Sequence, residues 1–271
     1  MSHRAKKSLG QHFLRSSSAV KAIVGAGSVG AADTVLEIGP GEGVLTAALL
    51  ATGAHIVAVE KDRDLIPVLS ERFSAELAAG QLELIEADVL DFDPSKHGLA
   101  GGAYKLVANI PYYITGAIFE KFLTEETPPS LMVVLIQKEV ATRIVARDGK
   151  QSILSISVRA FGAPKITAKV PASAFRPVPK VDSAVLLVAD ISNKHFAGTG
   201  VSKEGAIKHF FTIVRAAFAH KRKLLARNLE DVSSKEAIHA MLAELSISEK
   251  ARAEDLPSEK WFAIAKILKT K

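Results

Sequence analysis

Short apolar stretches alternate with segments of helical periodicity over the first two-thirds of the chain. Five of these stretches are rich in Val, Ile and Leu, and they cover residues 34–39, 55–60, 82–87, 105–109 and 131–137. Strands so short and so apolar are typical of a parallel sheet that is buried on both faces and connected by helices. The pattern therefore predicts an α/β domain, with helices over residues 44–52 and 64–79 among the connections.

The pattern changes after residue 160. Residues 165–170 and 183–189 have the composition of strands, and no long helix separates them. Two successive strands without a helix between them indicate an antiparallel, hairpin-like finish to the sheet.

A polar, glycine-containing stretch at residues 190–203 has the character of a linker. Beyond it the chain is helical in pattern, over residues 206–219, 221–229, 233–245 and 258–268. The third of these segments opens on Ser233 and Glu236, which have the spacing of a capping box. We therefore expect two domains, over residues 1–192 and 203–271.

The composition narrows the chemistry that the chain can perform. Its 271 residues are 48% apolar and 24% charged, which is typical of a globular protein. The absence of cysteine excludes disulfide frameworks, cysteine nucleophiles, thiolate zinc sites and iron–sulfur clusters, and the eight scattered histidines give no reason to expect a metal. No apolar run approaches the ~18 residues of a membrane span, and the basic N-terminus lacks the apolar core of a secretory signal. We expect a soluble, cytoplasmic protein.

The net charge of +6 is unevenly distributed along the chain. Residues 1–32 carry five Lys and Arg and no acid, whereas residues 33–130 have a net charge of −10. Residues 131–204 have a net charge of +6, and residues 205–228 carry six basic residues and no acid. Basic stretches beside an acidic body favour a polyanionic partner such as nucleic acid, because contacts with phosphates release counterions. The competing interpretation is a set of solvated basic faces that bind nothing.

A glycine-rich turn, Glu-Ile-Gly-Pro-Gly-Glu-Gly at residues 37–43, joins the first predicted strand to its helix. Glycines let a ligand approach the backbone, but tight turns also use them, and the spacing fits neither a dinucleotide fingerprint nor a P-loop. Two acids, Glu60 and Asp88, stand at the next two strand ends, where open parallel sheets bind ligands. Together the three features favour an adenosine-containing ligand, with Glu60 on the ribose and Asp88 on the adenine amino group. The acidic character of this half suits a cationic ligand such as a sulfonium.

The fourth predicted strand ends in Asn109-Ile-Pro-Tyr112, which resembles the Asn/Asp-Pro-Pro-Tyr/Phe motif of methyltransferases that act on N6 of adenine. The adenine amine is a poor nucleophile because its lone pair is delocalised into the ring. The Asn109 side-chain oxygen and the carbonyl of Ile110 or Pro111 can accept its two N–H bonds, while Tyr112 stacks on the extruded base. Orientation then supplies most of the rate effect without a strong general base. As a bare pattern, Asn-x-Pro-Tyr also fits a simple turn.

Three further motifs extend the resemblance from end to end. They are Ser-Leu-Gly-Gln-His-Phe-Leu at residues 8–14, Phe-Arg-Pro-Val-Pro-Lys-Val-Asp-Ser at residues 175–183 and Arg-Ala-Ala-Phe-Ala-His-Lys-Arg-Lys at residues 215–223. With these motifs the chain resembles the small-subunit (16S) rRNA adenine dimethyltransferases. The resemblance implies a seven-stranded, Rossmann-like sheet of an S-adenosylmethionine (SAM)-dependent methyltransferase, with a small all-helical C-terminal domain. It also implies methyl transfer from SAM to N6 of two adjacent adenines in a hairpin near the 3′ end of 16S rRNA, a step of ribosome biogenesis.

The resemblance assigns roles to individual residues. It implies SAM contacts at His12, Leu14, Gly39, Glu60, Asp88 and Asn109. It implies catalytic and base-stacking groups at Asn109, Pro111, Tyr112 and Phe175. Two positions depart from the commonest pattern, because His12 stands where Asn is frequent and Tyr113 where Asn often follows the tyrosine. Taken without the family, Phe175 is a loop anchor held by Pro177 and Pro179, whereas a stacking role requires an exposed ring.

The basic segment over residues 208–227 has two compatible interpretations, an apolar side that packs inward and a basic side that contacts rRNA phosphates. Two other functions stay open. One is a non-catalytic nucleic-acid-binding assembly or transcription factor on the same fold, against which the intact glycine loop, Asn109 and Tyr112 argue. The other is a resistance methyltransferase of large-subunit rRNA, which the N-terminal motif and residues 175–183 disfavour. The expected partner is 16S rRNA in the small subunit, and the enzyme is expected to be a monomer.

Overall fold

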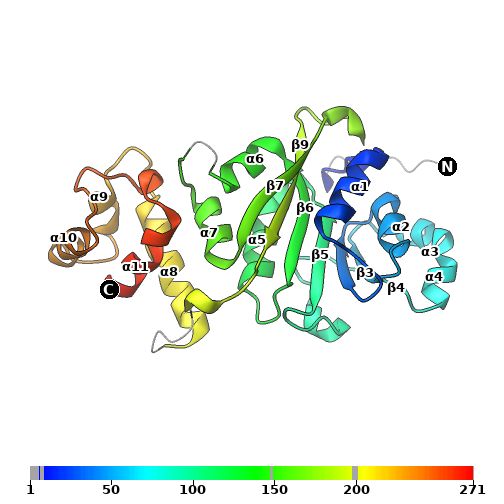
Figure 1. Cartoon of the computed structure of the whole chain (residues 1–271), viewed down its shortest axis with the longest axis horizontal. Helices are drawn as coiled ribbons and strands as arrows, with labels where there is room; N and C mark the ends of the chain where they lie inside the picture. Colours follow the sequence, from blue (N-terminus) through cyan, green and yellow to red (C-terminus); the bar gives the residue numbers. More distant parts are fainter. Residues whose placement is uncertain (1–5, 7–8, 147–148, 197–200, 271) are drawn as a thin grey trace. The chain divides into compact units, whose positions relative to one another are not determined.

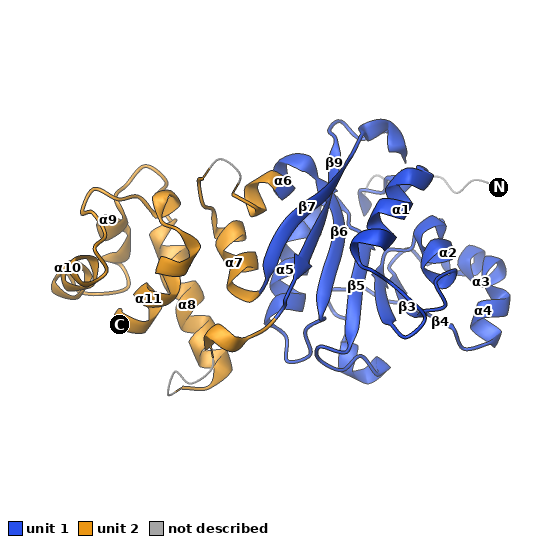
Figure 2. Ribbon diagram, in the orientation of Figure 1, with its two compact units in different colours: residues 1–141, 162–191 blue, residues 142–161, 192–271 orange. Residues whose placement is uncertain are grey.

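The computed structural model describes residues 6, 9–146, 149–196 and 201–270. The chain divides into two compact units (Figure 2), one formed by residues 1–141 and 162–191 and the other by residues 142–161 and 192–271. The sequence pattern alone counts residues 142–161 with the first domain, whereas the contacts of the folded chain place them with the C-terminal helices.

The first unit is built around a seven-stranded sheet (Figure 1). Its strands are β2 (Thr34–Ile38), β3 (His55–Glu60), β4 (Leu82–Glu86), β5 (Tyr104–Asn109), β6 (Leu131–Gln137), β7 (Ala163–Val170) and β9 (Ser183–Ala189). They lie in the order β4-β3-β2-β5-β6-β9-β7, with the first five parallel and β9 antiparallel to both of its neighbours. Each strand predicted from the apolar stretches is present within two residues of its expected bounds, and the antiparallel finish is confirmed.

The sheet is buried on both faces. The helices of this unit are α1 (Ser17–Ala26), α2 (Val44–Leu50), α3 (Ile66–Arg72), α4 (Ser74–Ala78) and α5 (Thr115–Thr124). On one face Val35 belongs to an apolar cluster with Ile23 of α1 and Leu49 of α2. Successive side chains of a strand point to opposite faces, and Leu36, next to Val35, is also fully buried. Burial on both faces explains why the strands are continuous apolar runs rather than alternating ones.

The single helix predicted over residues 64–79 is wrong, because α3 and α4 are separate helices. Phe73 lies between them with φ −113° and ψ 30°, and its ring packs against the glycine loop. A Cβ at Gly43 would come within 2.6 Å of that ring, and Gly43 has φ +77°, which glycine adopts readily. Helical periodicity does not report a contact of this kind, because it arises between segments that are distant in the sequence.

The direction in which strands are added reverses beside β2. After β2 the chain runs outward through β3 and β4, and it then returns to the other side of β2 to form β5 and β6. Ligands of open α/β sheets bind at such a switch point, beyond the carboxyl ends of the strands. The glycine loop, Glu60, Asp88 and Asn109 all stand at these carboxyl ends.

A short antiparallel pair lies apart from the main sheet. β1 (Phe13–Leu14) pairs with β8 (Phe175–Arg176), so that Leu14 lies opposite Phe175. The first unit also contains the 3-10 helices η2 (Pro94–His97), η3 (Tyr112–Ile114) and η4 (Ala172–Ala174). None of the helices in the described part of the chain is long and apolar enough to cross a membrane.

The second unit is helical. Its elements are α7 (Ile153–Phe161), η5 (Lys194–Phe196), α8 (Lys203–Ala217), α9 (Leu225–Leu229), α10 (Lys235–Glu244), η6 (Ala253–Asp255) and α11 (Ser258–Ile267), while α6 (Lys138–Ile144) contains the point of division. An aromatic cluster explains why α7 belongs to this unit. The ring of Phe161 lies 5.1 Å from that of Phe196 and 6.2 Å from that of Phe211, measured between centroids.

Two local predictions in this unit are wrong. Residues 221–229 do not form one helix, because residues 221–223 lie in the turn between α8 and α9. The helix expected to begin with a capping box at Ser233 has Ser234 as its N-cap, whose Oγ accepts a hydrogen bond from the Ala237 N–H. The hydroxyl group of Ser233 instead donates to a backbone carbonyl near the C-terminus. Two adjacent serines are equally suitable caps by sequence, and tertiary contacts select between them.

Candidate active site

A cavity opens at the carboxyl ends of the parallel strands. It is lined by residues 9–14 ahead of α1, by residues 37–42 of the glycine loop and by residues 109–114 after β5. The predicted site residues that line it are His12, Leu14, Gly39, Glu60, Asp88, Asn109, Pro111 and Tyr112. The fold therefore brings into one place groups that the sequence separates by about a hundred residues.

The glycine loop leaves β2 with its backbone in the left-handed region. Gly39 has φ +65° and Gly41 has φ +59°, a conformation that glycine adopts without the cost that a side chain imposes. The Gly39 N–H donates to the Val59 carbonyl at 2.9 Å, which ties the loop to β3. Apart from Gly39 and its two chain neighbours, no atom of the described residues lies within 4 Å of the point where a Cβ on Gly39 would stand. A ligand can therefore approach the backbone at this point.

Glu60 ends β3, and backbone donors hold its carboxylate. Its Oε2 accepts a hydrogen bond from the Gly41 N–H at 3.1 Å, and its Oε1 accepts one from the Asp62 N–H at 2.8 Å. The residue is 5% exposed, and this burial raises the pKa of its carboxyl group. Each carboxylate oxygen has a second lone pair, so the oriented group can still accept hydrogen bonds from a ligand.

Asp88 follows β4 and forms an ion pair with Lys61. The Lys61 Nζ lies 2.6 Å from the Asp88 Oδ2, and the Asp88 Oδ1 accepts a hydrogen bond from the Leu90 N–H at 3.0 Å. The hydrogen bond from Lys61 lowers the pKa of Asp88. The group is therefore ionised at neutral pH, and it can accept a further hydrogen bond from an amino group.

Glu37 is a site residue that the sequence analysis missed. It lies on β2, lines the cavity and is 1% exposed. Burial raises the pKa of Glu37 to about 8, against the opposing effect of the Thr46 hydroxyl and with a smaller contribution from repulsion by Glu60. The available signal was an acid inside the apolar stretch Thr-Val-Leu-Glu-Ile. A cationic ligand in this acidic cavity would favour the ionised form of Glu37.

We expect Glu37→Gln to change how stability depends on pH. The pKa of Glu37 rises from 4.5, its ordinary value, to about 8 in the folded state, so the folded protein binds this proton more tightly than the unfolded chain. The folded state therefore loses stability relative to the unfolded chain as the pH rises from about 4.5 to about 8, by roughly 1.4 kcal/mol per unit of pKa difference. Gln removes this loss, so the variant should gain stability over the wild type as pH rises. Chemical denaturation of the cofactor-free proteins between pH 5 and 8 tests this, and a pH-independent difference would contradict it.

Asn109 ends β5, and the N-terminal segment fixes its side chain. Its Nδ2 donates a hydrogen bond to the His12 carbonyl at 3.1 Å. This bond uses the donor side of the amide and leaves Oδ1 to accept a hydrogen bond. The arrangement provides the oriented acceptor that transfer to an amine requires.

Tyr112 begins η3, and its ring is held from two directions. Its hydroxyl oxygen lies 2.8 Å from the Ser183 Oγ, and its ring stacks with that of His12 at 5.8 Å between centroids and 23° between planes. The His12 Nδ1–H donates to the Pro177 carbonyl at 2.7 Å. Tyr113, which is 62% exposed, also lines the cavity. Of the two positions that depart from the family pattern, His12 thus places a ring beside Tyr112 and Tyr113 adds a ring to the lining of the cavity.

Phe175 does not line the cavity. It is 2% exposed and belongs to the apolar cluster beneath the N-terminal segment, where β8 pairs with β1. The expectation of an exposed Phe175 ring is therefore wrong, because Phe175 belongs to the buried apolar cluster that also contains Phe13 and Leu14 of β1. The structure agrees with its interpretation as a loop anchor, and its part in base stacking stays a prediction.

Comparisons with known proteins agree over almost the whole chain. The family model described as ribosomal RNA adenine dimethylase matches residues 2–270. Proteins named ribosomal RNA small subunit methyltransferase A are similar to this chain. That of Dehalococcoides mccartyi is 40% identical over 95% of this chain and 86% of its own length. That of Clostridioides difficile is 37% identical over 98% of this chain and 91% of its own length.

Two solved structures share the fold. The 23S rRNA methyltransferase ErmE aligns with a TM-score of 0.73 at 25% identity, over 94% of this chain and 99% of that structure. A dimethyladenosine transferase from Plasmodium falciparum aligns with a TM-score of 0.78 at 24% identity, over 95% of this chain and 99% of that structure. The sheet, the cavity at its carboxyl ends and the match of the family model agree. The chain therefore belongs to the ribosomal RNA adenine dimethylase family, whose members are SAM-dependent methyltransferases.

Proposed function

We propose that this enzyme dimethylates N6 of two adjacent adenines in a hairpin near the 3′ end of 16S rRNA, within the small ribosomal subunit. The observation that carries the choice of subunit is the likeness, at 40% identity in one case, to proteins named small-subunit methyltransferases. The similarity to the 23S enzyme is lower, at 25% identity. The reaction is then a step of ribosome biogenesis, carried out by a cytoplasmic monomer.

SAM supplies an electrophilic methyl group on a positively charged sulfur. In this proposal the residues that hold the cofactor are His12, Leu14, Gly39, Glu60, Asp88 and Asn109. Glu60 accepts hydrogen bonds from the ribose hydroxyl groups, since its oriented carboxylate retains free lone pairs. Asp88 accepts a hydrogen bond from the adenine amino group of the cofactor. Gly39 admits the ligand to the backbone, and the positive charge of the cofactor favours the ionised form of Glu37, whose pKa without ligand is about 8.

The target amine is oriented by Asn109 and by the backbone before Tyr112. The hydrogen bond from the Asn109 Nδ2 to the His12 carbonyl fixes the plane of the amide. The Asn109 Oδ1 then accepts a hydrogen bond from one N–H of the target amine. The carbonyl of Ile110 or Pro111 accepts the other N–H, which makes the nitrogen pyramidal and directs its lone pair toward the methyl group. The amine becomes acidic once methylated and loses its proton without a strong base, so orientation supplies most of the effect.

The extruded adenine stacks on Tyr112 in this proposal. The hydrogen bond between the Tyr112 hydroxyl and Ser183 sets the plane of the ring, and stacking on an aromatic ring contributes about 1–3 kcal/mol per base. Because Phe175 is buried, its predicted part in stacking requires the pairing of β1 with β8 to loosen when RNA binds. His12 already lies beside Tyr112 without such a change.

Glu60→Ala should weaken SAM binding by about 1.5–3 kcal/mol, the scale of hydrogen bonds to a charged group. Isothermal titration calorimetry on the cofactor-free protein measures this directly. The matched control is Glu86→Ala, because Glu86 ends the neighbouring strand in register with Glu60 but is exposed and outside the cavity. Unchanged SAM affinity in the Glu60 variant would remove that residue from the site.

The choice of substrate can be tested with radiolabelled SAM and purified ribosomal subunits. The enzyme is incubated with undermethylated small subunits or with large subunits, and nuclease digestion then locates the label. We expect label on two adjacent adenines near the 3′ end of 16S rRNA. Label on 23S rRNA would favour the large-subunit alternative, and binding without any transfer would favour a non-catalytic factor.

A further inference from the structure

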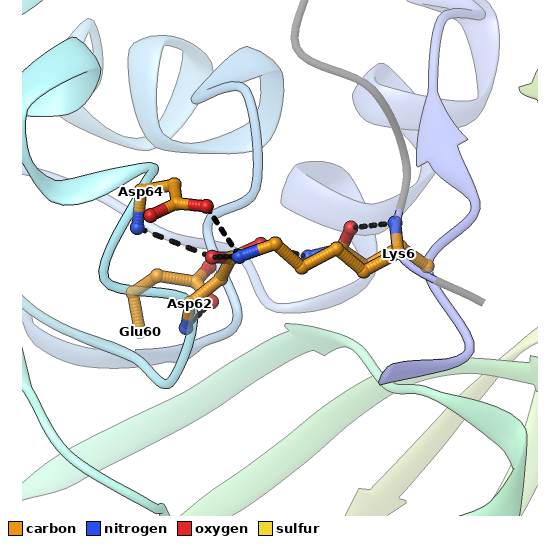
Figure 3. A network of polar contacts seen from close by, with 5 residues as sticks. Lys6, Glu60, Asp62 and Asp64 are labelled. Carbon is orange, nitrogen blue, oxygen red and sulfur yellow. Dashed lines mark hydrogen bonds and ion pairs between the residues drawn. The ribbon is translucent and has the colours of Figure 1, made fainter. Parts of the chain in front are cut away.

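The N-terminal segment is attached to the loop after β3 by a cluster of polar contacts (Figure 3). The Lys6 Nζ lies 2.5 Å from the Asp62 Oδ1 and 2.6 Å from the Asp64 Oδ2. The Gln11 Nε2 donates to the Asp62 Oδ2 at 2.8 Å, and the Lys6 backbone N–H donates to the Gln11 Oε1 at 2.7 Å. We call Lys6, Gln11 and Asp62 the clasp.

Asp62 is the centre of the clasp. Its side chain is fully buried, although it is ionised, whereas the side chain of Lys6 is 36% exposed. Burial alone would raise the pKa of Asp62, but the hydrogen bonds from Lys6 and Gln11 lower it to about 2. Removal of Lys6 or Gln11 would leave this buried carboxylate with fewer compensating contacts, which is unfavourable. The loop after β3 therefore favours a state in which the N-terminal segment is docked.

The same residue touches the cofactor site through its backbone. The Asp62 N–H donates to the Glu60 Oε1, and the Glu60 Oε2 accepts from Gly41. The docked segment also forms a wall of the cavity, because residues 9–14 line it. Its other end is attached by the bond from Asn109 to the His12 carbonyl. The segment thus connects the loop at Glu60 to Asn109.

We propose that the clasp positions Glu60 and residues 9–14 for SAM binding, so that Lys6, Gln11 and Asp62 are positioning residues for the cofactor. This inference rests on the proposed place of SAM beside Glu60. Asp62 and Lys6 act through their neighbours, because Asp62 reaches the cofactor through Glu60 and Lys6 through the docked segment, whereas Gln11 also lines the cavity itself. Docking of the segment and binding of SAM then favour each other.

The test compares Asp62→Asn, Lys6→Met and Lys6→Arg with the wild type. Calorimetry measures SAM affinity, hydrogen exchange measures protection of the amides of residues 9–14, and steady-state kinetics separates the KM for SAM from kcat. We expect Asp62→Asn and Lys6→Met to weaken SAM binding at least about fivefold, the lower end of typical coupling between sites. Exchange at residues 9–14 should become faster without SAM, and the KM for SAM should rise while kcat at saturating SAM is retained. Lys6→Arg keeps the ion pair and should bind SAM as the wild type does.

A matched control is Lys105→Met. The Lys105 Nζ forms an ion pair with the Asp33 Oδ2 at 2.8 Å, and Lys105 is 16% exposed, but the pair lies at the opposite ends of the strands and outside the cavity. Its loss should lower thermal stability without changing SAM affinity. A comparable loss of affinity in this variant would mean that any broken ion pair has the effect, and it would overturn the proposal.

Glu60→Ala, measured in parallel, separates a failure of the clasp from a failure of the proposed place of SAM. If it weakens SAM binding but Lys6→Met and Asp62→Asn do not, the clasp has no positioning role. If Glu60→Ala has no effect, the placement of the cofactor is wrong and the clasp proposal fails with it. Should Asp62→Asn fail to fold, Lys6→Met decides alone, because its side chain is partly exposed. Loss of affinity in Lys6→Arg equal to that in Lys6→Met would also overturn the proposal.

Discussion

Asn109→Ala will lose most methyl transfer while the enzyme still binds its RNA. The Asn109 amide orients an amine that reacts only when its lone pair points at the methyl group, so the contact matters chiefly in the transition state. Removal of one positioned hydrogen-bonding group of this kind lowers kcat by about 10²–10³-fold. The measurement is single-turnover transfer from labelled SAM to undermethylated small subunits at saturating enzyme.

Two further measurements make this result specific. SAM affinity is determined separately, because Asn109 also lines the cofactor cavity, and kcat is compared at saturating SAM. Asn109→Asp keeps an oxygen acceptor at the end of β5 and should retain more activity than the alanine variant, although it loses the donor to the His12 carbonyl. Dimethylation by Asn109→Ala at a rate near that of the wild type would show that the assigned mechanism is wrong.

Simultaneous replacement of Lys221, Arg222 and Lys223 by Ala will weaken binding to the small subunit and flatten its dependence on salt. All three side chains are exposed in the turn between α8 and α9, and they form no ion pair within the described residues. Arg227, by contrast, pairs with Glu230 at 3.2 Å. Each phosphate contact that is lost lowers the slope of log affinity against log salt by about 0.7–0.9. Loss of three contacts therefore reduces the slope by about 2 to 2.7.

The control for this prediction preserves charge. A variant with Lys221→Arg, Arg222→Lys and Lys223→Arg keeps three cations in the turn, and it should keep the salt slope of the wild type. SAM affinity should be unchanged in both variants, because the glycine loop and its acids belong to the other unit. An unaltered slope in the alanine variant would mean that these charges are only a solvated face. The RNA contacts would then have to be sought in residues 1–32 and 131–180.

Local composition was sufficient to predict the sheet and the edge at which the site lies. A strand that is buried on both faces is apolar along its length, so each stretch of Val, Ile and Leu predicted one strand. The bounds of the strands at residues 55–60 and 131–137 were predicted without error. Polar residues that interrupt or end such a strand remain visible in the sequence, as Glu60 and Asn109 show. Parallel strands bring their carboxyl ends to one edge, and the predicted residues there do line one cavity.

Contacts between distant segments were decided only by the tertiary structure. The burial of Phe175 follows from the pairing of β8 with β1, and the assignment of α7 to the second unit follows from its ring contacts with Phe196 and Phe211. The Lys6–Asp62 pair joins residues 56 positions apart, and neither residue differs by pattern from a solvated surface charge. Periodicity and composition describe how one segment divides its faces between core and solvent. Which residues each face contacts depends on the packing of the whole chain. For this reason the sequence by itself determined the strands and the acids at their ends, while the tertiary structure decided the partners of Phe175 and Asp62.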